Sequence, residues 1–206
     1  SGAVAYYVTT PIYYVNGEPH LGHAYTTIAA DVLARHMRQR GEDVFFLTGT
    51  DEHGEPIENA AEREGISPQE LADRNTEKFR QLMPIIDATN DFFIRTSDPR
   101  HKERVAEIMQ RVYDNGWVTK GTYEGWYCPR CADFKTEREL GPDQTCPIHE
   151  IPLERVKEEN WFFRLSAFQE RLEALYAERP DFVVPDFRPN QAGSFIEQGL
   201  RDGSLS

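Results

Sequence analysis

Two histidines three residues apart, His20 and His23, are the side chains near the start of the chain best suited to chemistry. In the first turn of a helix they would share one face. That turn also carries backbone N–H groups without intrahelical partners and the positive end of the helix dipole, which together favour a bound phosphate. Gly22, which lies between them, leaves room for a flat ligand such as a purine. These three residues therefore predict a nucleotide site.

The flanking pattern supplies the elements that would position this site. Residues 3–8 read as a buried strand, Pro19 suits the first position of a long helix, Gly41 ends that helix, and residues 44–47 read as a second strand. Histidines on a helix are more often solvated or hydrogen-bonded locally than bound to a ligand. Here the strands before and after the helix favour a ligand site. Strand, helix and strand with a right-handed crossover make half of a nucleotide-binding fold, whose ligands lie beyond the carboxyl ends of the strands.

Two further patterns refine the predicted helix and its site. No Gly-x-Gly-x-x-Gly follows the first strand and no Gly-Lys-Ser/Thr occurs, so the phosphate contacts must come from the histidines. An apolar stripe at helical spacing predicts the face of the helix that packs in the core; it consists of Ile28, Val32, Leu33 and Met37.

A second constellation lies far along the chain and is chemically independent of the first. Cys128 and Cys131 form one knuckle, and Cys146 and His149 form another after fourteen residues. Three thiolates and one imidazole make a tetrahedral set that suits Zn²⁺, and four protein ligands leave no open position for water. A disulfide framework would leave one cysteine over, and no signal peptide indicates an oxidising compartment. We therefore predict one structural zinc ion per chain.

Composition agrees with a globular α/β protein without identifying it. The chain has 206 residues, of which 39% are hydrophobic and 28% charged, enough for one or two domains. No apolar run is long enough to span a bilayer, so we expect no membrane association and a cytoplasmic location. The net charge of −12 has the wrong sign for gripping a polyanion unaided.

The remaining pattern predicts a three-stranded parallel sheet followed by a different region. We place the first half of a nucleotide-binding fold at residues 3–116, and an insert at 117–206 with its zinc knuckles at 126–150. The other predicted elements are helices at 55–64, 68–82, 98–115 and 166–178 and strands at 91–95, 118–127 and 161–163.

Two segments, Tyr7–His23 and Phe46–Gly54, resemble the methionyl-tRNA synthetases, which are class I aminoacyl-tRNA synthetases. His-Leu-Gly-His at 20–23 is similar to the His-Ile-Gly-His signature of that class. The resemblance implies a class I synthetase sheet of the Rossmann type, interrupted by a zinc-binding connective insert. It also implies roles for six residues: ATP contacts from His20, Gly22 and His23, and methionine contacts from Ile12, Tyr14 and Asp51.

These implied roles are chemically reasonable. Asp51 follows the second strand, where its carboxylate could bind an α-ammonium through a charge-assisted hydrogen bond, although such an aspartate alone is about as often a turn residue. Ile12 and Tyr14 would form an apolar and aromatic wall suited to a thioether sulfur, although tyrosines in turns are more often packing residues.

For function, the resemblance implies a methionine–tRNA ligase that uses ATP with Mg²⁺, L-methionine and tRNA. The family completes its site with a second half-fold and a Lys-Met-Ser-Lys-Ser loop, and no lysines here have that spacing. We therefore expect a truncated catalytic fragment that lacks its C-terminal half and is inactive or weakly active alone. The alternatives are a catalytically incompetent, zinc-stabilised nucleotide-binding module, or another class I adenylyl-transferring enzyme, which would not explain the zinc knuckles.

Overall fold

The computed structural model describes residues 5–131, 133–184 and 187–205, which fall into two compact units. The first unit comprises the chain up to Val105 together with Cys128–Asp133. The second comprises Ala106–Tyr127 and the residues from Phe134 onward. The domain limits predicted at 3–116 and 117–206 stay a prediction.

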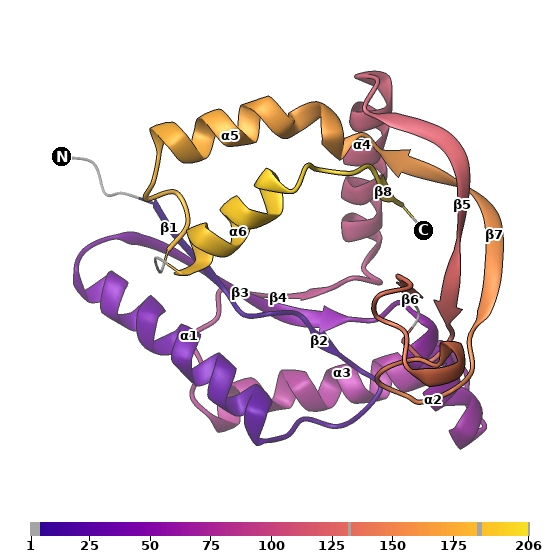
Figure 1. Cartoon of the computed structure of the whole chain (residues 1–206). Coiled ribbons are helices and arrows are strands. Elements are labelled where there is room, and N and C mark those ends of the chain that lie inside the picture. Colours follow the sequence, from indigo (N-terminus) through magenta and orange to yellow (C-terminus); the bar gives the residue numbers. More distant parts are fainter. Residues whose placement is uncertain (1–4, 132, 185–186, 206) are drawn as a thin grey trace. The chain divides into compact units, whose positions relative to one another are not determined.

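A four-stranded parallel sheet forms the centre of the first unit (Figure 1). Its central strand, β3 (Asp43–Asp51), pairs in parallel with β1 (Ala5–Thr9), β2 (Tyr13–Tyr14) and β4 (Phe92–Arg95). Leu47 is in register with Thr9 of β1 and Phe92 of β4, so these two strands lie on opposite edges of β3. The predicted α/β class with a parallel sheet is confirmed, and β2 is an additional short strand.

Three helices connect these strands: α1 (Leu21–Gln39), α2 (Glu55–Glu64) and α3 (Pro68–Ile85). The two crossovers run in the same direction across the sheet, and Figure 1 shows α1 and α3 on the same side of it. The helix predicted at 55–64 is confirmed, and α3 extends three residues beyond its predicted end. Their core contains Tyr13, Val15, Ile57, Ala60, Ala61, Leu71, Ala72 and Phe79.

The prediction for the core face of α1 is wrong. Three of the four stripe residues, Ile28, Val32 and Leu33, are 46%, 59% and 48% exposed, and the fourth, Met37, is half-buried. Small side chains occupy the buried face instead, and this allows the helix to lie close to Phe46 and its neighbours on the sheet. The buried residues of α1 are Thr27, Ala30, Asp31 and Ala34. The packing face therefore could not be identified from hydrophobicity, because a helix that lies close to the sheet needs small side chains at the contact.

The prediction that the first strand is buried is also wrong. Residues of β1 alternate between exposed and half-buried, and Tyr7 is 61% exposed. Val8, Val44 and Phe46 pack with α1. Because side chains alternate along a strand, Tyr7 and Phe45 lie on the opposite side of the sheet, with ring centroids 6.2 Å apart. Residues 3 and 4 of the predicted strand lie outside the described residues.

The second unit is built on a sheet with strand order β6-β5-β7-β8. Its long antiparallel pair, β5 (Val118–Cys128) and β7 (Glu154–Phe163), confirms both predicted aromatic strands and lengthens the second. The other elements are α4 (Pro99–Asp114), which leads into this unit, β6 (Asp133–Lys135), η1 (Pro142–Gln144), η2 (Leu165–Phe168), α5 (Gln169–Glu178), α6 (Phe187–Glu197) and β8 (Gly203–Ser204). Of these, β6, η1, α6 and β8 were not predicted. None of the helices in the described part of the chain is long and apolar enough to cross a bilayer.

The tight packing of Gly49 in β3 against β4 gives a test of this sheet. A Cβ added at Gly49 would collide with the backbone carbonyl oxygen of Ile94. We expect Gly49→Ala to lower the free energy of unfolding by about 1–3 kcal/mol, because backbone cannot yield as a side chain can. Gly17→Ala is the matched control, since nothing lies within 4 Å of its added Cβ. Urea unfolding measures both, and equal stabilities would contradict the described pairing.

Candidate functional site

The carboxyl ends of the parallel strands bring the predicted methionine residues to one edge of the sheet. Tyr14 ends β2 and Asp51 ends β3, and the two are partners in the register of these strands. Tyr14 is 60% exposed, whereas Asp51 and Ile12 are half-buried. This edge is where ligands of parallel α/β sheets bind.

A hollow of about 440 Å³ lies beside this edge. Four of the six residues predicted for ATP and methionine line it: Ile12, Tyr14, His20 and His23. Asp51 is brought to the same region by its pairing with Tyr14, and Gly22 lies between the two lining histidines in the sequence. The structure thus brings together residues that are up to about forty positions apart in the chain.

His20 and His23 form a reciprocal cap at the start of α1. The helix begins at Leu21, so His20 is its N-cap residue and Pro19 lies before the cap, not at the first helical position as predicted. His20 Nδ1 accepts a hydrogen bond from Gly22 N at 3.0 Å, and His23 Nδ1 accepts one from His20 N at 3.0 Å. This is the geometry of a capping box, with two imidazoles in place of the usual hydroxyl and carboxylate.

The cap changes which groups at the start of α1 are available to bind a phosphate. Two backbone N–H groups that were expected to be open are bonded to the histidines themselves. Because Nδ1 of each ring accepts a hydrogen bond, a neutral ring carries its proton on Nε2. Each imidazole therefore retains an Nε2–H donor for a ligand. A phosphate at the start of α1 could be bound by these side chains as well as by backbone N–H groups.

The absence of a side chain at Gly22 makes room for the His20 ring of the cap. A Cβ at this position would come within 2.8 Å of His20 Cε1 and 3.0 Å of His20 Nδ1. The space left by the missing side chain is therefore taken by the capping ring, whereas the sequence suggested that it would receive a purine.

His23 is held in an aromatic cage. Its ring meets Tyr13 edge-on at 4.8 Å and Phe79 edge-on at 4.9 Å, and the His20 ring lies 3.9 Å away. Tyr13 is itself fixed by a 2.8 Å hydrogen bond with Thr27. Burial lowers the pKa of His23, and the neighbouring His20 lowers it further. A neutral donor ring is thus favoured at this position.

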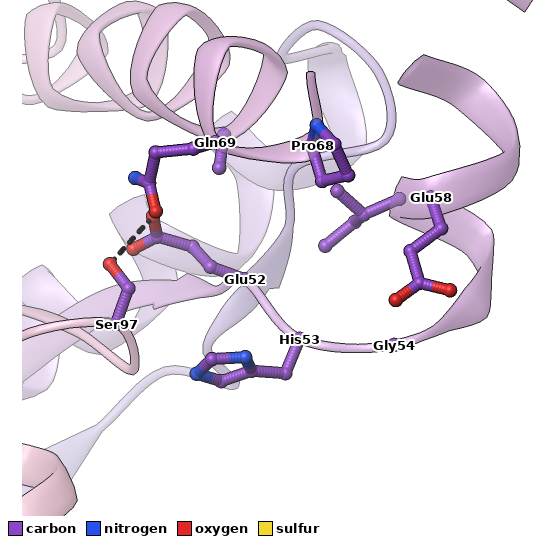
Figure 2. A pocket seen from close by; sticks show the side chains of 9 residues that line it. Glu52, His53, Gly54, Glu58, Pro68, Gln69 and Ser97 are labelled. Atoms are coloured by element: carbon purple, nitrogen blue, oxygen red, sulfur yellow. Dashed lines mark hydrogen bonds between the residues drawn. The ribbon is translucent and has the colours of Figure 1, made fainter. Parts of the chain in front are cut away.

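A buried ion pair adjoins Asp51, and the sequence analysis did not identify it. Glu52 bonds to Arg95 through both of its carboxylate oxygens, at 2.9 Å and 2.5 Å. Figure 2 shows Glu52 and its hydrogen bond from Ser97 in a second hollow of about 130 Å³, with His53 and Glu58 nearby on its lining. Arg95 ends β4 as Asp51 ends β3, so the rule that neighbouring parallel strands end at one edge could have found this pair.

The predicted metal ligands also come together. One potential ligand atom from each of Cys128, Cys131, Cys146 and His149 lies within 4.8 Å of all the others. Cys128 and Cys146 are fully buried. The backbone N–H groups of Cys131 and His149 each approach the sulfur of the first cysteine of their own knuckle at 3.4 Å. This Cys/His group could hold a metal ion.

Comparison with known proteins gives consistent similarities. Residues 6–155 match the family model described as tRNA synthetases class I (M). The chain is 51% identical to a methionine–tRNA ligase of Streptomyces coelicolor and 50% identical to one of Thermotoga maritima, over 100% and 98% of its length. It spans only 40% and 32% of those two relatives.

Solved structures give the same picture. The structure of Mycobacterium tuberculosis methionyl-tRNA synthetase in complex with methionyl-adenylate matches 98% of this chain with a TM-score of 0.89 and 40% sequence identity. The chain covers 40% of that protein.

The lowered pKa of His23 predicts how stability depends on pH. Just below the ordinary histidine pKa of about 6.5, the unfolded chain binds a proton at this residue more readily than the folded chain. The free energy of unfolding should therefore rise with pH from the folded pKa up to about 6.5. Urea unfolding across this range, with His23→Gln as the comparison, should show a smaller rise in the variant. An NMR titration placing the His23 pKa above 6.5 would contradict the prediction.

Proposed function

Since the chain belongs to the class I tRNA synthetases of the methionine type, we propose that it forms the N-terminal catalytic part of a methionine–tRNA ligase. One observation carries the proposal: two imidazoles with Nε2–H donors and the paired ends of β2 and β3 surround one edge of a parallel sheet. The methionyl-adenylate held by the M. tuberculosis relative supports methionine and ATP as the ligands.

The roles of individual residues follow from their chemistry. His20 and His23 donate Nε2–H to the phosphates of ATP, beside Gly22. Asp51 binds the ammonium group of methionine, while Ile12 and Tyr14 contact its side chain. A neutral His23 is an advantage in this role, because it donates without needing a proton from solvent.

The reaction needs little covalent chemistry from the protein. The carboxylate of methionine is ionised at neutral pH, so it attacks the α-phosphorus of ATP directly, and pyrophosphate leaves with the electrons of the broken P–O bond. Catalysis then depends on alignment and on stabilising charge on the phosphates. Mg²⁺ bound with ATP would neutralise part of that charge. A hydroxyl of the terminal ribose of tRNA then attacks the carbonyl carbon of the methionyl-adenylate, and AMP leaves with the electrons of the broken C–O bond.

The proposal includes a C-terminal half that completes the site and contacts the tRNA. The net charge of −12 is unfavourable for tRNA binding by this chain alone. The C-terminal half could pack on the exposed apolar side chains of α1, which are Ile28, Val32 and Leu33. We propose a cytoplasmic location for the complete enzyme.

We propose zinc as the metal of the Cys/His group, in a structural role. Thiolates and imidazole are the ligands of structural zinc sites, and four of them close the coordination sphere. The ion would join the two knuckles and restrain the segment between β5 and β7.

Metal analysis tests the zinc proposal. We expect one Zn²⁺ per chain, and its removal by a chelator should raise hydrogen exchange across roughly residues 117–163 while sparing β1, β3 and β4. His149→Ala should lose metal, whereas the control His36→Ala, an exposed histidine on α1, should keep it. Metal well below one equivalent, or unchanged exchange after chelation, would disprove the proposal.

ATP–pyrophosphate exchange tests the enzymatic proposal. The full-length protein should exchange with methionine in preference to other amino acids, and the 206-residue chain alone should exchange poorly or not at all. Exchange with a different amino acid would indicate another adenylyl-transferring enzyme, and no exchange by the full-length protein would indicate a nucleotide-binding module.

Substitutions in the full-length protein separate binding from chemistry. Asp51→Ala should chiefly weaken methionine binding, whereas His20→Ala or His23→Ala should lower the exchange rate by about 10²–10³ with nearly unchanged methionine affinity. The controls are Asp43→Ala, at the exposed opposite end of β3, and His36→Ala. Steady-state exchange with methionine and ATP varied separately measures both effects. Parent-like rates in both histidine variants would refute their roles.

A further inference from the structure

Asp51 lies between two residues that are fastened to one short segment, Arg95, Thr96 and Ser97, which we call the β4 clamp. Among residues 5–131, 133–184 and 187–205, no side chain or backbone group bonds the Asp51 carboxylate. That carboxylate is thus available to a ligand. Its position depends on how firmly the neighbouring backbone is held.

The backbone is fastened on both sides of Asp51 by Thr96. Thr96 N donates to the carbonyl oxygen of Thr50 at 3.2 Å, and Glu52 N donates to Thr96 Oγ1 at 2.8 Å. Thr96 is buried, so these bonds are shielded from competing water. The peptide groups that flank Asp51 are therefore tied to one residue.

The side chain of Glu52 adds a stronger attachment. It is 1% exposed, and Arg95 binds it with Nε and Nη2, while Ser97 Oγ donates to Oε1 at 3.1 Å (Figure 2 shows the Ser97 bond). Thr50 Oγ1 donates to Oε2, also at 3.1 Å. Burial of a carboxylate is costly unless it is paired and hydrogen-bonded, and these bonds are the ones that offset that cost for Glu52.

The guanidinium group of Arg95 also fixes the orientation of the Glu52 carboxylate. Two parallel N–H donors fix the plane of the Glu52 carboxylate, which a lysine ammonium cannot do. Nη2 of Arg95 also donates to Asp73 of α3 at 2.5 Å, so a second carboxylate restrains the guanidinium. The hydrogen bonds from Arg95 to Glu52 raise the pKa of the arginine, and Asp73 raises it further.

We propose that the β4 clamp, and Arg95 in particular, is the positioning element that aims the Asp51 carboxylate at the ammonium group of the amino-acid substrate. Arg95 acts through Glu52 and does not touch the substrate. This inference rests on the proposed function, because it takes Asp51 as the ammonium ligand.

The test compares methionine with 4-(methylsulfanyl)butanoate, which is methionine without its ammonium group. Calorimetric binding of both to the full-length protein gives a discrimination ratio. We expect Arg95→Lys, which keeps the buried Glu52 paired with a cation, to lower this ratio roughly tenfold, since small misplacements of a binding group are costly. Affinity for the analogue should stay unchanged.

Arg100→Lys is the matched control and should leave the ratio unchanged. Arg100 makes a similar pair with Asp98 nearby, but its side chain is 75% exposed. If Arg95→Lys is too unstable to purify, Glu52→Gln removes the same fork from its other end and should lower the ratio likewise.

The outcomes separate the two proposals. A parent protein that binds both compounds equally would refute Asp51 as the ammonium ligand, and with it the proposed function of this edge. A parent that discriminates, with Arg95→Lys or Glu52→Gln retaining the parent ratio, would overturn only the positioning role. Equal weakening of both compounds would also overturn it, because a general structural defect does not distinguish the ammonium group.

Discussion

Parallel pairing on both edges of β3 is the constraint on which the candidate site depends. It brings the ends of β2, β3 and β4 to one place, and so gathers Tyr14, Asp51 and Arg95 from three separate parts of the chain. The close approach of β4 at Gly49 allows this pairing. Buried hydrogen bonds from the segment after β4 then hold the residues on each side of Asp51. The position of a ligand-binding carboxylate is thus a consequence of sheet geometry.

The histidine cap joins helix stability to ligand chemistry. The Nδ1 atoms stabilise the start of α1, and the same hydrogen bonds determine that the Nε2 atoms carry the protons. Tyr13 and Phe79 keep water from His23 and favour its neutral form. His23 can therefore provide an oriented donor in its neutral form, and less reorganisation is needed when a charged ligand binds.

The two units rely on different interactions for their order. The first has a helix-covered sheet with a buried apolar core. The second is built on a four-stranded sheet whose long antiparallel pair is β5 and β7, and aromatic rings such as Tyr123 and Phe134 lie 4.4 Å apart on it. A metal ion at the Cys/His group would restrain the two knuckles, which lie between β5 and β7 in the sequence.

The sequence by itself determined the features that depend on local spacing. Histidines at 20 and 23, paired Cys-x-x-Cys and Cys-x-x-His knuckles, and helix signals such as Ser67 with Glu70 are each expressed within a few residues. Only the tertiary structure decided which face of α1 is buried, because close approach to the sheet favoured Ala30 and Ala34 over larger side chains. It likewise decided that Glu52 pairs with Arg95 and that Thr96 bonds the backbone on both sides of Asp51. Such contacts join residues that the chain separates, and their energies depend on burial that no local pattern specifies.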